Sequence, residues 1–371
     1  MPDQLPEALV ALRERTREVA RQASLAWSER TRAGLDDAGR KERTDAVRAW
    51  SRQAGLYGLT QDPGSGALVL LVARETLALE GVGHWTGWFG SEAGLLAGVA
   101  EPLRSSHLLP LLAGDKRSGF AFTEPAGMPR PTWARVEGDQ LVINGRKSYV
   151  TQGAQADFLV ALVDVEGTGP AMVVIDTDAP GVRIERRFES LDGSQHAAFV
   201  FEDARVPAHC AIGAPGDGRS QAIHKISGVR RAVAADCVGT TGWILDQLAN
   251  TLRKPRRDGP LANHDRIRLR FGHLRILAYA ARSTVYRTAR LVDSGDAAVN
   301  ESIAAKVFAS EVADEVIDTA IQLTGGEALV VGHPLEGAVR RLRASRLVEG
   351  ENDVLRVNVA RGYLDLDKGR L

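Results

Sequence analysis

The chain has 371 residues, 44% of them hydrophobic, and its 47 basic residues balance its 47 acidic residues, so the formal net charge is zero. A chain of this length buries a large core and favours two or three domains. Binding to nucleic acid or to an acidic membrane surface requires an excess of basic residues, so the neutral charge argues against both as the main partner.

The chain contains two cysteines, Cys210 and Cys237, and neither belongs to a CxxC pair or to a zinc-binding pattern with histidine. We therefore expect no disulfide framework and no metal site. Charged residues from Glu7 onward leave no apolar stretch of the kind that a signal peptide needs, and no later apolar run has the length of a membrane span. The sequence predicts a soluble, cytoplasmic protein with no membrane partner.

The first part of the chain carries a helical pattern. Apolar residues recur at helical spacing around residues 9–23 and again around residues 68–79. We therefore predict an N-terminal α-helical domain over residues 1–119.

Between Phe120 and about Ile212 short runs rich in β-branched and aromatic residues replace the helical pattern. The expected strands are residues 140–143, 158–163, 171–175 and 198–201. The dipeptides expected to form turns are Asn144-Gly145, Pro180-Gly181 and Asp192-Gly193. A small β domain, a barrel or a sandwich, is predicted over residues 120–220.

After about Gln221 the helical pattern returns. One long helix is expected around residues 267–285 and another around residues 303–320, the second ending at Gly325-Gly326. Arg253–Pro260 is the clearest loop. A C-terminal helical bundle is predicted over residues 221–371, so the expected fold class is α+β with several domains.

Separated motifs occur in the order and spacing of one known protein family. They are His107–Lys116, Phe120-Ala-Phe-Thr-Glu-Pro125, Asn144-Gly145-Arg-Lys147, Tyr149-Val-Thr151, Val200-Phe-Glu-Asp203, Arg205-Val-Pro207, Gln322-Leu-Thr-Gly325-Gly326 and Glu349-Gly350. From about Ala46 onward the chain resembles the acyl-CoA dehydrogenase flavoproteins. The resemblance implies a helical domain, a β-barrel or sandwich domain and a four-helix bundle, in that order.

The resemblance also implies a bound flavin adenine dinucleotide (FAD). Phe122 and Thr123 match residues that hydrogen-bond the pyrimidine edge of the flavin. Tyr149 stands where the family usually has a tryptophan against the flavin ring, which keeps an aromatic face of smaller area. Thr151 matches a hydroxyl near flavin N5, although an ordinary strand threonine would look the same.

Gln322, Gly325 and Gly326 match residues that bind the adenosine end of FAD from a neighbouring subunit, although a simple helix C-cap also explains the glycines. The resemblance therefore implies a homodimer or homotetramer. Proline occupies position 255, where the family has a pyrophosphate-binding arginine, and Arg253 or Arg256 is a candidate substitute.

Glu349 is the candidate catalytic base. The resemblance implies that Glu349 removes an α-proton from an acyl thioester while the β-hydrogen leaves as hydride to flavin N5, with Arg230 and Gly350 at the substrate. Because a thioester α-proton is far less acidic than a carboxylic acid, the base must be desolvated and aimed, and closure of the site would raise the pKa of Glu349 towards neutrality. Some relatives place the base just before the arginine matched by Arg230, but this chain has Val229 there.

The chain also departs from the family pattern. The loop Ala126–Pro131 after Thr-Glu-Pro is shortened and contains two prolines. Glu351 and Asp353 place two carboxylates close to the expected cofactor phosphates, which is repulsive unless they are compensated or turned away.

Three functions stay open. The first is a flavin-dependent acyl thioester dehydrogenase, acting on a coenzyme A (CoA) thioester or, in a biosynthetic pathway, on an acyl group carried by an acyl carrier protein. Its electron acceptor would be an electron-transfer flavoprotein or oxygen. The second is a flavin enzyme of the same fold that performs oxygen-dependent oxidation. The third is a degenerate, non-catalytic binding or assembly subunit.

Overall fold

The computed structural model describes residues 5–62 and 64–365, and its first helices follow the predicted pattern. In the first helix Leu12, Val19, Ala23 and Trp27 form one buried face. Asp36 caps the second helix by accepting a hydrogen bond of 2.8 Å from the Gly39 amide. The N-terminal elements are α1 (Glu7–Arg32), α2 (Asp37–Gln53), the 3₁₀ helix η1 (Tyr57–Thr60) and α3 (Ala67–Leu79).

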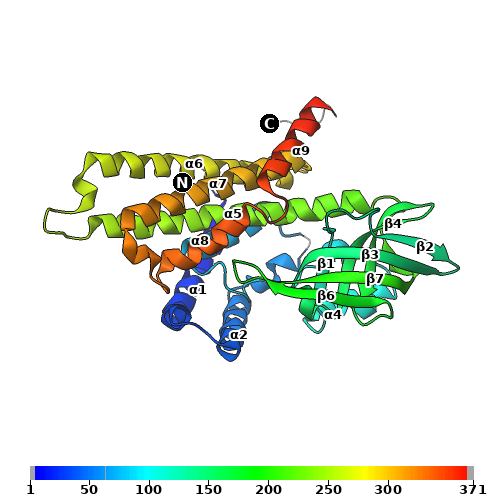
Figure 1. The fold of residues 1–371 in the computed structure, drawn as a ribbon. Coiled ribbons are helices and arrows are strands. Elements are labelled where there is room, and N and C mark those ends of the chain that lie inside the picture. The colour runs from blue at the N-terminus through cyan, green and yellow to red at the C-terminus, as the bar shows by residue number, and fades with distance from the viewer. Residues whose placement is uncertain (1–4, 63, 366–371) are drawn as a thin grey trace. The chain divides into compact units, whose positions relative to one another are not determined.

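The two long helices predicted near the C-terminus are confirmed, and both extend beyond the predicted stretches. The C-terminal elements are α5 (Gly218–Arg253), η6 (Leu261–Asn263), α6 (Asp265–Asp293), α7 (Val299–Thr324), η7 (Gly326–Leu329), α8 (Pro334–Ser345) and α9 (Asn352–Leu364). Helices α5, α6 and α7 run alongside one another (Figure 1).

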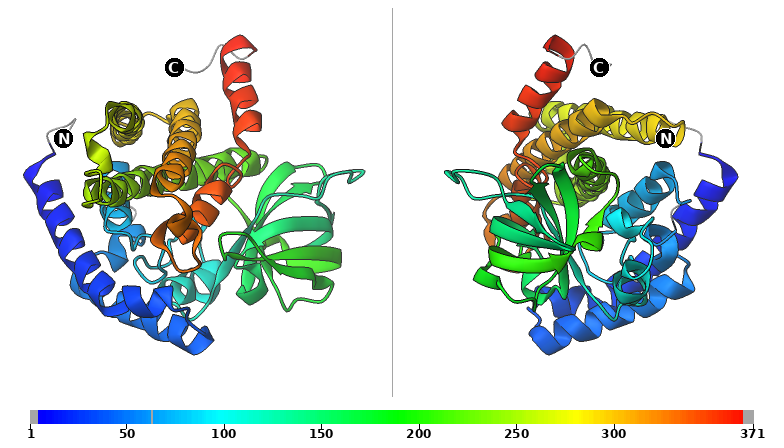
Figure 2. Two further views of the ribbon diagram at one scale, coloured as in Figure 1. Left: turned by 60° about the vertical axis from the view of Figure 1, so that its left-hand side comes forward. Right: turned by 90° about the vertical axis from the view of Figure 1, so that its right-hand side faces the viewer.

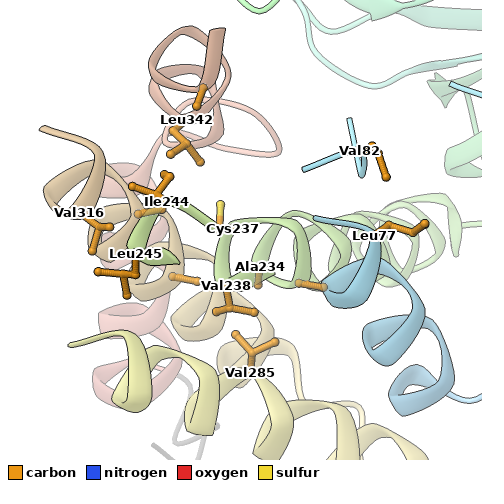
Figure 3. Packing of buried hydrophobic residues seen from close by; sticks show 14 of the residues in the cluster. Leu77, Val82, Ala234, Cys237, Val238, Ile244, Leu245, Val285, Val316 and Leu342 are labelled. Carbon is orange, nitrogen blue, oxygen red and sulfur yellow. The ribbon is translucent and has the colours of Figure 1, made fainter. Parts of the chain in front are cut away.

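The chain divides into two units. One consists of residues up to Phe89 together with those from Ser227 onward, and the other is Gly90–Ile226. We call them the helical unit and the sheet unit. Figure 3 shows the core of the helical unit, where Leu77 of α3, Val238 of α5 and Val285 of α6 are buried. A Cβ atom on Gly239 would lie 2.4 Å from the Glu75 carbonyl oxygen, so this glycine allows α5 to approach α3 closely.

The sheet unit contains one strongly twisted sheet (Figure 2). The strand order is β6-β7-β3-β2-β4-β5-β8, and β1 pairs in parallel with β4. The strands are β1 (Ser118–Ala121), β2 (Trp133–Glu137), β3 (Gln140–Thr151), β4 (Phe158–Val165), β5 (Gly169–Asp176), β6 (Val182–Glu189), β7 (Gln195–Pro207) and β8 (Ala211–Ile212). The helical segments of this unit are η2 (Gly94–Leu96), the π-helical η3 (Arg104–Leu108), α4 (Leu109–Ala113), η4 (Gly153–Gln155) and η5 (Ala208–Cys210).

The predicted turn at Asn144-Gly145 is wrong. Strand β3 continues through both residues and stays paired with β7, with a register shift between Ile143 and Gly145. Gly145 has φ of 140°, and a Cβ atom on it would lie 2.7 Å from Thr132. The glycine therefore allows a β-bulge and a close approach to Thr132, the residue before β2, instead of a hairpin.

The other expected turns are confirmed, because Pro180-Gly181 joins β5 to β6 and Asp192-Gly193 joins β6 to β7. The sequence pattern missed β1, β2, β6 and β8. Of these, β6 lies at an edge of the sheet and carries many charged residues, as edge strands often do.

The predicted fold class is confirmed: N-terminal helices, a middle sheet and C-terminal helices follow in that order. The boundaries 1–119, 120–220 and 221–371 stay a prediction, and the two units group the elements more coarsely. Among the described helices none combines the length and the apolarity that a membrane crossing requires.

Candidate functional site

The loop after β1 contains the first two predicted cofactor residues, Phe122 and Thr123. The Thr123 carbonyl oxygen accepts a hydrogen bond of 2.8 Å from the Ser148 amide of β3, and the Phe122 carbonyl oxygen accepts one of 3.3 Å from Lys147 Nζ. The Thr123 side chain is exposed, and Phe122 is half-buried. The main chain of this loop is therefore fixed at a residue that is exposed.

Lys147 and Glu124 form an ion pair that holds the loop to β3. Lys147 is 1% exposed, and its Nζ lies 2.7 Å from Glu124 Oε1. Burial lowers the pKa of Lys147, and the pairing with Glu124 opposes this. Burial alone raises the pKa of Glu124, but hydrogen bonds from Lys147 and the Thr132 amide outweigh it, so this pKa is lowered overall.

Tyr149 and Thr151 lie at the end of β3. Tyr149 has φ of 55° and remains 60% exposed, and its ring meets Phe188 edge-on at 5.3 Å between centroids. A left-handed backbone is unfavourable for an aromatic residue and persists only when neighbouring contacts impose it. Here the neighbouring Val150 is fully buried, so the backbone turns the Tyr149 ring outward.

A chain of hydrogen bonds ends at the Thr151 hydroxyl. Ser194 Oγ donates to Asp192 Oδ1 at 2.6 Å and lies 2.9 Å from His196 Nε2, while His196 Nδ1 lies 3.4 Å from Thr151 Oγ1. Because the one Ser194 hydroxyl proton is used for Asp192, His196 Nε2 must be the donor to Ser194. In a neutral imidazole Nδ1 is then an acceptor for Thr151.

Sequence reasoning missed His196. Burial lowers its pKa, and the Asp192 carboxylate and the Tyr149 backbone oppose this shift. His196 pairs with Thr151 across β3 and β7, so only the strand register identifies it as a neighbour of the candidate site.

The candidate base lies in a tight turn between α8 and α9. Glu349 has φ of 56° and Gly350 has φ of 105°. Arg230 Nε donates to the Glu349 carbonyl oxygen at 2.9 Å, and Lys306 Nζ donates to the Gly350 carbonyl oxygen at 2.8 Å. We call residues 349–352 the base turn. The structure thus brings together three predicted site residues: Glu349, Gly350 and Arg230.

Lys306 is a second residue that sequence reasoning missed. It is fully buried and also donates to Asn352 Oδ1 at 2.8 Å. Its place between Ile303 and Val307, on the predicted buried face of α7, is the sequence signal that could have found it.

Glu351 and Asp353 are both engaged locally. Glu351 caps α9 by accepting hydrogen bonds of 3.0 Å from the amides of Asp353 and Val354. Asp353 Oδ1 lies 2.7 Å from Arg356 Nη1. Carboxylates at a helix N-terminus are stabilised by the helix dipole, so their negative charge is compensated within the chain.

The remaining predicted residues lie elsewhere in the helical unit. Gln322, Gly325 and Gly326 are exposed at the end of α7, and Arg256 is exposed in the loop after α5. The stretch of α7 from Lys306, which contacts the base turn, to Gln322 is about 24 Å long at the rise of an α-helix. The chain therefore does not bring Gln322 to Glu349. In the part of the chain that the structure describes, no cluster of His, Cys, Asp and Glu suited to a metal ion is found.

Comparisons with known proteins agree with this architecture. Residues 119–204 match the family description "Acyl-CoA dehydrogenase, middle domain", and residues 216–364 match "Acyl-CoA dehydrogenase, C-terminal domain". A probable acyl-CoA dehydrogenase of Bacillus subtilis is 30% identical over 336 residues, which cover 84% of this chain and 88% of the relative. The chain is thus an oxidoreductase of the type that acts on CH–CH bonds. It belongs to the acyl-CoA dehydrogenase family.

Further relatives extend the comparison. Human mitochondrial short-chain specific acyl-CoA dehydrogenase is 29% identical over 273 residues, which cover 70% of this chain and 66% of the relative. The structure of butyryl-CoA dehydrogenase from Megasphaera elsdenii matches with a TM-score of 0.81 and 24% identity, covering 98% of this chain and 100% of that chain. An acyl-CoA dehydrogenase from Bacillus anthracis, solved in complex with FAD, matches with a TM-score of 0.81 and 22% identity, covering 98% and 68%. The likeness to these two structures shows the fold.

Proposed function

We propose that the chain catalyses the α,β-dehydrogenation of an acyl thioester with FAD as its cofactor and Glu349 as the base. The observation that carries this proposal is the base turn, in which a glutamate with a left-handed backbone has its carbonyl oxygen held by Arg230. Family membership supports dehydrogenation, and the relative from Bacillus anthracis, solved with FAD, supports the cofactor.

Three exposed residues of the sheet unit have side chains suited to binding a flat, polar ring. Tyr149 is an exposed aromatic residue, and Thr123 and Thr151 are exposed residues with hydroxyl groups. We assign the flavin to these three residues together with Phe122. An aromatic face and hydroxyl groups are the contacts that a flavin ring can use.

We assign the other end of FAD to Gln322, Gly325 and Gly326 of a second copy of the chain, with Arg256 at the pyrophosphate. The distance of about 24 Å along α7 between Lys306 and Gln322 supports this assignment to another copy. Two exposed glycines allow the backbone to approach a ligand closely, and the exposed Arg256 has a guanidinium suited to phosphate. The enzyme would then be a homodimer or a homotetramer.

Within this assignment Glu349 takes the α-proton of the thioester. Bound flavin supplies the acceptor for the hydride that leaves the β-carbon. Glu349 raises the pKa values of Arg230 and Lys306, although burial lowers both overall, so the two cations lie within electrostatic reach of the candidate base. Arg230 would thereby position the base, and Gly350 would lie beside the substrate as the next residue of the turn.

Replacing Glu349 with glutamine tests the proposal. Glutamine is nearly isosteric but accepts no proton at neutral pH, so flavin reduction by an acyl-CoA in a single turnover should slow by about 100-fold to 10,000-fold. Flavin content and unfolding should match the wild type. Asp353→Asn is the control, because it removes a carboxylate from the same region without touching the base. An unchanged rate in Glu349→Gln would place the base elsewhere.

The carrier of the acyl group is a finer part of the proposal. The loop Ala126–Pro131 is held in place, because the Arg130 guanidinium stacks 4.0 Å from the centroid of the Trp133 ring. A short, fixed loop supports an entrance that accepts the pantetheine arm of an acyl carrier protein. Flavin reduction by one acyl group on both carriers decides the point: equal or better turnover with the CoA thioester would rule out a dedicated carrier-protein enzyme.

A further inference from the structure

Lys306 is a buried cation whose hydrogen bonds go to the base turn. It lies on α7 with no exposed surface, and its Nζ donates to the Gly350 carbonyl oxygen and to Asn352 Oδ1, both at 2.8 Å. Asn352 is itself 2% exposed and donates to Ser310 Oγ at 3.1 Å and to Glu311 Oε1 at 3.2 Å. Lys306 and Asn352 therefore connect the turn to α7.

The base turn needs such support because of its backbone. Glu349 and Gly350 are consecutive residues with positive φ, and a side chain rarely adopts this conformation without neighbours that impose it. A Cβ atom on Gly350 would lie 2.9 Å from Leu355 and 3.4 Å from Arg230. The turn is thus bounded by α5, α7 and α9. Removing Lys306 would leave the buried Asn352 Oδ1 and the partly buried Gly350 carbonyl oxygen without this donor.

The charges around Lys306 come from two elements. Arg230 and Cys237 face it from α5, while Glu349 and Glu351 face it from the base turn. Burial raises the pKa of Cys237 to about 12, so its thiol is neutral near pH 8. The two carboxylates are therefore the charges that favour the ammonium form of Lys306, and Arg230 opposes it.

We propose that Lys306 is a positioning residue whose ammonium group holds the base turn, so that loss of its proton misplaces Glu349 and lowers turnover. This inference rests on the proposed role of Glu349. An ammonium has three donors and makes charge-assisted hydrogen bonds, whereas a neutral amine makes weaker ones.

The pH range follows from the environment of Lys306. Burial lowers the pKa of Lys306 to about 8, and the attraction of Glu349 and Glu351 only partly offsets this. We therefore expect kcat to fall as pH rises through about 8.

Lys306→Met is the first test, because methionine keeps an unbranched apolar stem and removes the donors. At pH 7 its kcat should fall by about 10-fold to 100-fold, the effect of displacing a catalytic group by about 1 Å. The decline of kcat above pH 8 should disappear. Val312→Ala is the matched control, since it truncates a buried residue of the same helix that lies in the main core. It should keep the wild-type pH profile.

Lys306→Arg covers the case in which the methionine variant does not fold. A guanidinium remains charged throughout the accessible pH range, so the decline in kcat above pH 8 should be absent. A wild-type decline in either variant would overturn the proposal.

Titration of Lys306 by NMR gives a readout that does not depend on catalysis. In protein labelled with ¹³C at lysine Cε, one signal that is absent from Lys306→Met should titrate near pH 8. Glu349→Gln should shift that titration to lower pH, because it removes an attracting carboxylate. An unshifted titration would overturn the inference, whereas an active Glu349→Gln enzyme would overturn the proposed function and leave the titration unaffected.

Discussion

The sheet unit and the helical unit each use a buried lysine to hold a short segment of candidate site, but the two lysines have different partners. Lys147 is paired with a carboxylate, Glu124 Oε1, at 2.7 Å. Lys306 instead donates to the Gly350 carbonyl and the Asn352 side-chain oxygen, which are neutral. The pKa of Lys306 falls to about 8, whereas the pairing with Glu124 opposes the fall for Lys147.

The different partners of the two lysines show how a change of pH can alter one part of an enzyme and leave another part unchanged. A buried ammonium with a charged partner keeps its proton over a wide range, because losing it would leave the carboxylate unpaired. A buried ammonium with neutral partners loses its proton closer to neutrality. We therefore expect the loop that contains Thr123 to tolerate alkaline pH better than the base turn.

The largest expected effect on stability is that of breaking the Lys147–Glu124 pair. Glu124→Gln leaves a lysine that is 1% exposed without its counter-charge, and should lower the free energy of unfolding by about 3 kcal/mol. Lys147→Met should cost less, because the remaining Glu124 side chain is 23% exposed and reaches water. Unfolding in guanidinium chloride measures this free energy for the two variants and the wild type. If both variants lose the same free energy of unfolding, then the deeper burial of Lys147 does not determine the cost of breaking the pair.

The same pair gives a pH dependence at acid pH. The pKa of Glu124 is lower in the folded chain than its usual value, so the unfolded chain binds more protons as pH falls. Glu124 therefore stabilises the fold fully at pH values above the usual pKa of a glutamate. This stabilisation is lost as pH falls through the lowered pKa of Glu124.

Lys306 has the opposite effect on the free energy of unfolding. Because its pKa is lowered in the folded chain, Lys306 destabilises the fold below pH 8. This cost shrinks as pH rises from 8 towards the usual pKa of a lysine.

A smaller effect is expected at the end of the base turn. Glu351→Ala removes the cap of α9, in which one carboxylate accepts from the amides of Asp353 and Val354, and should cost about 1 kcal/mol of unfolding free energy. Because Lys306 also loses an attracting carboxylate, its titration should move to lower pH. Glu351→Gln serves as the control, since it keeps an acceptor for the cap but removes the charge. Glu351→Gln should be nearly as stable as the wild type. Its Lys306 titration should lie at the same lowered pH as in Glu351→Ala.

The fold class could be predicted because helical spacing, β-rich runs and motif order all indicated the same architecture. The turn assigned to Asn144-Gly145 was wrong, since a bulge glycine and a hairpin glycine look alike until the partner strand β7 is known. Glu349 could be proposed from a local motif. His196 could not, because only strand register identifies Thr151 as its neighbour. The spacing of α7 could place Lys306 on a buried face, but it could not show the contact with Gly350.

The smallest expected effect concerns His196, a titratable group of the sheet unit. Burial lowers its pKa, so the folded chain favours the neutral imidazole and stability falls as pH drops from about 6.5 through that lowered pKa. His196→Gln should remove this slope, because glutamine does not titrate. The test compares the unfolding midpoints of the variant and the wild type between about pH 5 and 8. This range covers about three units around the usual pKa of histidine. Ser194→Ala is the matched control: it removes the link to Asp192 but keeps the imidazole, so a slope should remain. If the histidine and glutamine proteins share one pH profile, then His196 contributes no pH-dependent stability in this range.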